Sequence, residues 1–195
     1  MVELKVLQAV RLKGKVNPAG LAATVDEDPA TVASTVAGLI EAGLLIGGKA
    51  LKLSPDGRSR LRALLEQERA GVDHCAIAAA YEEFVAANAD FKVVVSDWKL
   101  KNGESNHHDD PDHDAAVLAR LEAVHARVLK VISAAAEQIP RLRGYADKLV
   151  TALQMVQDGD TVWLTQPVVD SYHTVWFELH EELILAAEVT PGSSP

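Results

Sequence analysis

The sequence predicts a mainly α protein in two parts: a small unit of three to four helices with one β-hairpin, then an antiparallel helical bundle. Three observations predict this. Capping residues followed by proline mark helix starts, apolar residues recur with helical spacing, and the composition changes after residue 70. We therefore expect domains at 1–70 and 71–189, with a flexible tail at 190–195.

Several helix starts combine a capping side chain with a proline, whose missing N–H costs nothing at the first helical position. In the first 70 residues this spacing predicts a helix from Leu4 that Gly14 ends, then helices at 18–24 and 29–42, and a fourth from residue 55. Short apolar runs at 44–46 and 50–53 indicate two strands joined by a glycine turn. The capped starts are Asn17-Pro18, Asp28-Pro29, Ser54-Pro55 and Asp110-Pro111.

Helix, helix-turn-helix, hairpin and helix is the order of a winged helix. Residues 4–69 resemble the DNA-binding part of MarR-like bacterial regulators. The run from Val32 to Leu45 is similar to the recognition helix that leads into the wing, and Leu51 to Arg58 is similar to the strand after the wing. The resemblance implies DNA binding. The short wing at Gly47-Gly48-Lys49 departs from the longer, Arg-tipped wing of the family.

A recognition helix places its exposed N-terminal side chains in the major groove. The exposed candidates here are short, and none is Arg, Lys, Asn or Gln, the side chains that read bases with two hydrogen bonds. Basic residues near the wing are candidates for phosphate contacts. In the alternative interpretation, the winged helix docks onto a partner and does not read DNA. The candidate DNA-binding residues are Thr31, Ser34, Thr35, Lys49, Lys52 and Arg58.

The charge is unevenly distributed. Residues 1–70 hold 10 Lys and Arg against 8 Asp and Glu, whereas residues 71–195 hold 9 against 20. Because the acidic part repels phosphate backbones, any nucleic-acid contact belongs to the first part. A single cysteine, Cys75, excludes an internal disulfide and fits a reducing compartment. With no strongly apolar stretch of membrane-spanning length, we expect a cytoplasmic protein that does not bind a membrane.

After residue 70 the apolar spacing predicts helices at 72–89, 91–100, 111–139, 145–157 and 167–187, with a polar loop over 101–112. The segment from Asp170 to Leu183 resembles a tail of actinobacterial proteins related to phosphoenolpyruvate/pyruvate dikinases. That resemblance suggests a pathway, with a phosphotransferase system as a partner, but no activity. The sequence has no phosphohistidine loop, ATP-grasp signature or barrel pattern.

Histidines occupy the predicted helix faces that pack inward. His125 lies in the apolar stripe of one helix, and His173 and His180 lie two turns apart beside the apolar face of another. If these helices pack together, the rings line a pocket suited to a small polar or anionic effector or to a metal. The alternative is a set of separately satisfied core histidines. The candidate ligand-binding residues are Asp97, Trp98, His125, Asp170, His173, Trp176 and His180.

The run from His107 to Asp114 is rich in His and Asp, which bind divalent metals. The alternative is structural: Asp110 caps a helix, and two acidic residues after it favour the positive end of the helix dipole. No other cofactor is expected. Neither a phosphate-binding Gly loop nor a G-x-S-x-G or HExxH motif is present, and adjacent His74 and Cys75 diverge on a helix, so we expect no enzyme.

Two functions fit these features. The first is a winged-helix transcriptional regulator that binds DNA as a homodimer and is controlled by a small ligand or a protein partner in the helical part. The second is an accessory protein whose winged helix docks a partner, for example in a phosphoenolpyruvate/pyruvate phosphotransferase system. The absence of base-reading side chains on the recognition helix and the net acidity of the chain favour the second.

Overall fold

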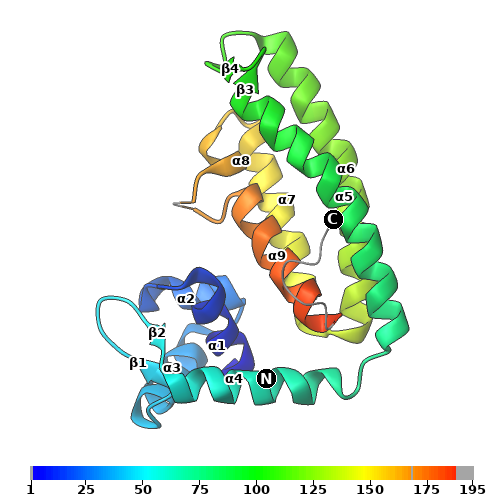
Figure 1. Ribbon diagram of the computed structural model, residues 1–195. Coiled ribbons are helices and arrows are strands. Elements are labelled where there is room, and N and C mark those ends of the chain that lie inside the picture. The colour runs from blue at the N-terminus through cyan, green and yellow to red at the C-terminus, as the bar shows by residue number, and fades with distance from the viewer. Residues whose placement is uncertain (1, 168, 188–195) are drawn as a thin grey trace. The chain divides into compact units, whose positions relative to one another are not determined.

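The computed structural model describes residues 2–167 and 169–187. The chain divides into two compact units, Met1–Val72 and Asp73–Pro195, and both consist mainly of helices (Figure 1). In the described residues the strands form two short antiparallel hairpins. The predicted mainly α class is confirmed. The tail expected at 190–195 lies outside the described residues.

The first unit begins with three helices, α1 (Val2–Lys13), α2 (Pro18–Val25) and α3 (Pro29–Glu41). They pack around an aliphatic core in which Val6, Leu7 and Leu21 have no exposed surface. Asp28 begins α3 as its sequence predicts, because its carboxylate accepts a hydrogen bond from the backbone N–H of Thr31.

A hairpin follows α3. Strand β1 (Leu45–Ile46) pairs with β2 (Lys52–Leu53), so that Leu45 lies opposite Leu53 and both face the core. The segment between α1 and α2 adds a bridge, in which the N–H of Leu51 donates to the carbonyl of Val16 at 2.9 Å. The hairpin is therefore tied to the helices by backbone hydrogen bonds.

Helix α4 (Pro55–Arg69) closes the unit and starts against the backbone before β1. The N–H of Ser54 donates to the carbonyl of Leu44 at 3.1 Å, and the Ser54 hydroxyl accepts from the N–H of Gly57 at 2.9 Å. A Cβ at Gly57 would lie 2.0 Å from the Leu44 oxygen. The start of α4 therefore requires glycine at this position.

Two long helices dominate the second unit. Helix α5 (His74–Lys99) and α6 (Pro111–Gln138) lie side by side and antiparallel (Figure 1). The two helices predicted at 72–89 and 91–100 are wrong, because α5 is continuous: no glycine or proline interrupts it. Between α5 and α6, β3 (Leu100–Lys101) pairs with β4 (Glu104–Ser105), where the sequence predicted only a polar loop.

After α6 the chain forms a short 3-10 helix, η1 (Pro140–Arg143), then α7 (Gly144–Gln157), α8 (Val162–Thr165) and α9 (Tyr172–Ala186). Helix α9 packs against α5, α7 and α8. The last helix was predicted from residue 167 but starts later, because the Ser171 side chain accepts from the N–H of Thr174 and caps it. Among the described helices, none has the length and apolar character needed to cross a membrane.

Candidate functional site

At the N-terminal end of α3, the polar side chains form hydrogen bonds with one another and with the helix backbone. One oxygen of Asp28 accepts from the N–H of Thr31 at 2.8 Å and from its hydroxyl at 2.9 Å, and these bonds lower the pKa of the carboxyl. The hydroxyl of Thr35 donates to the Thr31 carbonyl at 2.8 Å. Two of the three predicted base-contacting hydroxyls are therefore engaged within the helix. The third predicted residue, Ser34, is exposed.

The outward face of α3 carries no charge, since the sequence from Pro29 to Ile40 contains none. Its exposed side chains are small, and Ile40 beside them is 40% exposed. On β1, Ile46 is 53% exposed. This face offers van der Waals contact but no cation for a phosphate.

Basic residues lie instead on and beside the β1–β2 hairpin. Lys49 and Lys52 are exposed, and among the described residues neither forms an ion pair. Lys15 is also exposed and precedes Val16, which bridges to Leu51. At the start of α4 the exposed Arg58 donates from Nη1 to the Leu53 carbonyl at 3.3 Å. The predicted phosphate-contacting residues therefore lie on and beside one hairpin.

In the second unit, His125 of α6 meets the first residue of α9. Its Nδ1 is hydrogen-bonded to the hydroxyl of Tyr172 at 3.0 Å. Tyr172 is completely buried, and burial raises the pKa of its hydroxyl far above the ordinary value. Burial also lowers the pKa of His125, whereas the nearby Glu122 acts in the opposite direction. The ring thus has a structural partner.

The other two predicted histidines lie along α9 against α5. The ring of His173 packs on Phe91 with centroids 6.1 Å apart, and that of His180 packs on Phe84 at 5.2 Å. Trp176, between them, stacks on Phe91 at 4.2 Å and donates from Nε1 to Asn88 at 2.9 Å. Both histidines of α9 therefore contact aromatic rings of α5.

Asp97 and Trp98 lie elsewhere on α5. Trp98 follows Phe84, on which His180 packs, by 14 residues, or about 21 Å along a helix. The Asp97 carboxylate pairs with Arg120 at 2.7 Å. Asp170 lies 3.7 Å from the Nζ of Lys148. The structure therefore does not gather all seven predicted ligand-binding residues at one point.

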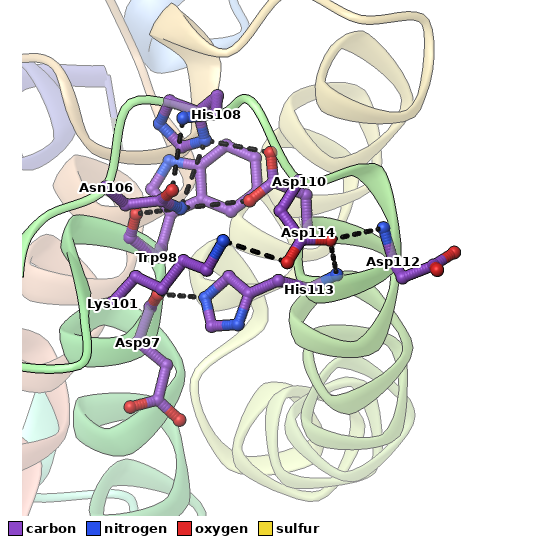
Figure 2. Close-up of polar contacts among 9 residues, drawn as sticks. All are labelled: Asp97, Trp98, Lys101, Asn106, His108, Asp110, Asp112, His113 and Asp114. Carbon is purple, nitrogen blue, oxygen red and sulfur yellow. Dashed lines mark hydrogen bonds and ion pairs between the residues drawn. The ribbon is translucent and has the colours of Figure 1, made fainter.

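Trp98 belongs to a polar cluster where the β3–β4 hairpin meets the start of α6 (Figure 2). His108 lies over its ring with centroids 4.5 Å apart and donates from Nδ1 to Asp114 at 3.0 Å. The amide of Asn106 donates to the other Asp114 oxygen at 2.9 Å and to the Trp98 carbonyl at 3.1 Å. Both oxygens of Asp114 are therefore engaged.

The same cluster caps α6 (Figure 2). Asp110 accepts from the N–H groups of Asp112 and His113, and it pairs with Lys101 of β3 at 2.8 Å. The lysine, and then the His113 N–H, hold the pKa of Asp110 below its usual range. The His113 ring donates from Nε2 to the Asp97 carbonyl at 3.0 Å. These contacts fix the hairpin to both long helices.

No metal site emerges from this geometry. Among the residues that the structure describes, no three His, Cys, Asp or Glu side chains are arranged to hold an ion. The His-rich and Asp-rich run instead supplies the helix cap and hairpin contacts, and Asp110 is the cap that the sequence predicted.

A buried ion pair, which the sequence did not predict, joins η1 to α9. Arg141 of η1 donates to Glu182 of α9 at 2.7 Å, and their side chains are 6% and 1% exposed. The hydroxyl of Tyr145 donates to the same Glu182 oxygen at 3.3 Å, and burial raises the pKa of this tyrosine. Glu178, one turn earlier, is 3% exposed. The sequence feature that could have predicted this pair is the four-residue spacing of Glu178 and Glu182, which places both on the inward face of α9.

Comparisons with known proteins add no family to these observations: no protein-family model, curated protein or solved structure matches the chain.

Proposed function

We propose that the chain is a winged-helix transcriptional regulator. Its N-terminal unit binds DNA, two copies of the chain act together, and the helical unit carries the regulatory input. The element order of residues 2–69 and the hairpin after α3 support the winged-helix interpretation.

The observation that carries the proposal is the concentration of unneutralised cations at the hairpin. Lys49 and Lys52 extend into solvent without an anionic partner among the described residues, and Arg58 is exposed at the start of the next helix. Each such cation that reaches a phosphate releases a condensed counterion from DNA, which favours binding. The lysines are therefore available for phosphates at no cost in broken ion pairs.

The same geometry predicts weak base recognition. The threonine hydroxyls of α3 are committed to Asp28 and to the helix backbone, and α3 offers no side chain that forms two hydrogen bonds with a base. Binding therefore depends on the phosphate backbone and on DNA shape more than on base contacts.

Fluorescence anisotropy with a labelled duplex of mixed sequence tests the proposal. The full chain should bind the duplex at low salt, and the variant Lys49→Ala/Lys52→Ala should bind it several-fold more weakly. A matched control, Lys130→Ala/Arg143→Ala, removes two exposed cations of the helical unit and should bind like the wild type. Equal losses in the two variants would contradict a DNA interface at the hairpin.

A second function is favoured by the uncharged face of α3. Asp28 places a carboxylate at the start of this helix, and Ile40 and Ile46 are exposed near its end. Such a surface suits a protein partner better than a phosphate backbone. If the chain fails to bind any duplex even at low salt, the docking function replaces the regulator.

The regulator further requires a dimer, because a two-fold operator is read by two copies. Multi-angle light scattering at micromolar concentration should give twice the chain mass. A monomer under these conditions would count against the regulator and leave the docking function in place.

A further inference from the structure

Three histidines contact aromatic groups where α9 packs against its neighbours. His125 of α6 bonds to Tyr172, the first residue of α9, while His173 packs on Phe91 and His180 on Phe84. The same rings belong to the aromatic layer that joins α9 to α5. Any change in these imidazoles therefore acts on the packing of one helix.

The environment of His180 in particular favours a neutral imidazole. The Nε2 atom of His180 is buried, and among the described residues it has no hydrogen-bond partner. A proton there would create a charged donor without an acceptor, which is costly in a buried site. The charge of Lys92 also opposes a positive charge on His180, and that of Lys99 opposes one on His173, which is exposed apart from its contact with Phe91.

Burial is the largest influence on all three groups and lowers the pKa of each. Nearby carboxylates oppose this effect only in part: Glu122 beside His125 and Glu181 beside His180. The titratable or charged groups that face the three rings are Tyr81, Lys92 and Lys99 of α5, Glu122 of α6, and Tyr172 and Glu181 of α9.

We infer that α9 is an acid-sensitive element, which detaches from the helical unit when His125, His173 and His180 become protonated. This inference goes beyond DNA binding and supplies a regulatory input that needs no bound ligand. In the unfolded chain these histidines titrate near pH 6.5. Because their folded pKa values are lower, the packing is fully stable above that pH and weakens as the pH falls from 6.5 through the folded values.

The effect is confined to one part of the chain. All seven histidines lie after residue 70, so residues 1–72 contain none. The first unit therefore keeps its stability over the same pH range and provides an internal control in the full-length protein.

Hydrogen–deuterium exchange of the full chain, followed by peptide mass spectrometry, tests the inference. Protection factors, which correct for the intrinsic pH dependence of exchange, should fall in α9 by about tenfold or more between about pH 7.5 and about pH 5.5. Those of α1 should stay within about twofold. The variant His125→Gln/His173→Gln/His180→Gln should remove the pH dependence in α9, whereas His74→Gln/His107→Gln, which changes exposed histidines, should leave it intact.

An unchanged protection of α9 in the wild type would overturn the inference, as would an equal acid-induced loss in the triple variant. If the triple variant does not fold, the imidazole C2 proton resonances of the wild type give the answer. Three of them should titrate below about pH 6.5, the ordinary value for histidine, and midpoints at or above that value would overturn the inference as well.

Discussion

The buried ion pair between Arg141 and Glu182 joins η1 to α9 across 41 residues of sequence. Taking two charges out of water is expensive, and attraction at 2.7 Å offsets that cost only while both partners are present. The second oxygen of Glu182 is buried without a partner among the described residues, so the carboxylate depends on Arg141 and Tyr145. The pair therefore makes the position of α9 sensitive to single substitutions.

We predict that Arg141→Met lowers the free energy of unfolding of the helical unit by about 3–5 kcal/mol, because Glu182 is left as an uncompensated buried charge. Urea titration followed by tryptophan fluorescence measures this, since all three tryptophans lie in the second unit. Arg127→Met is the matched control: Arg127 pairs with Asp90 on the surface, so its loss should cost less than about 1 kcal/mol. Equal losses would show that the buried pair contributes no more than a surface pair.

Residue by residue, the sequence predicted local chemistry and missed distant partners. Asp28, Ser54 and Asp110 cap the helices they were expected to cap, because a cap needs only its own next three residues. The bond from His125 to Tyr172 spans 47 residues and depends on how α6 and α9 pack, which apolar spacing does not determine. Of the histidines expected on inward helix faces, His125 and His180 are partly buried, whereas His173 is exposed.

Among the helices and hairpins, the start of α4 lies close to the backbone of Leu44, the residue before β1. Ala normally stabilises a helix relative to Gly, yet a Cβ at Gly57 meets the Leu44 oxygen at 2.0 Å. At Gly38, in α3, a Cβ would meet nothing within 4 Å. Substitution of these two glycines by alanine therefore distinguishes the effect of packing, at Gly57, from that of helix propensity, at Gly38.

We predict that Gly57→Ala destabilises the first unit by about 1–3 kcal/mol, since the hairpin must move away from α4. Gly38→Ala should instead stabilise it by about 0.5–1 kcal/mol. Thermal unfolding followed by circular dichroism distinguishes them through shifts of opposite sign. A shift to higher temperature for Gly57→Ala would contradict the contact.

Asp110 stabilises the start of α6 in two ways, as the helix cap and as the partner of Lys101. Asp110→Ala removes both the cap and the partner of Lys101, so the urea midpoint reported by tryptophan fluorescence should fall. Asp110→Asn should retain most of the stability, because Asn also caps helices. Since the folded pKa of Asp110 is lowered, its contribution is present above its ordinary pKa and is lost as the pH falls through the folded value. An equal fall for both variants would assign the effect to the ion pair alone.

The elements missed from the sequence have physical explanations. The β3–β4 hairpin was hidden in a polar stretch, although Asn102-Gly103 is a typical two-residue turn and both residues adopt positive φ. The division of α5 into two helices was placed at a polar interval from Asn88 to Asp90, which the continuous helix accommodates. Ala89 and Asp90 lie on its exposed side, and Asn88 accepts a hydrogen bond from Trp176. Apolar spacing alone did not distinguish such an interval from a break.

At the scale of the whole molecule, charge separates the two units. The change in composition after residue 70 lies next to the boundary at Val72, and the acidic excess belongs to the second unit. An acidic unit repels DNA, so the cations of the first hairpin must supply the attraction. The regulator account therefore depends on few charges, which makes it easy to test.

The most direct test is the salt dependence of duplex binding. For each phosphate contact, the logarithm of the binding constant falls with the logarithm of salt concentration with a slope of about −0.9. We predict that Lys49→Ala/Lys52→Ala reduces the magnitude of the slope by about 1.8 and weakens all duplex sequences alike. An unchanged slope, or a loss of affinity confined to one base position, would contradict binding through the hairpin lysines.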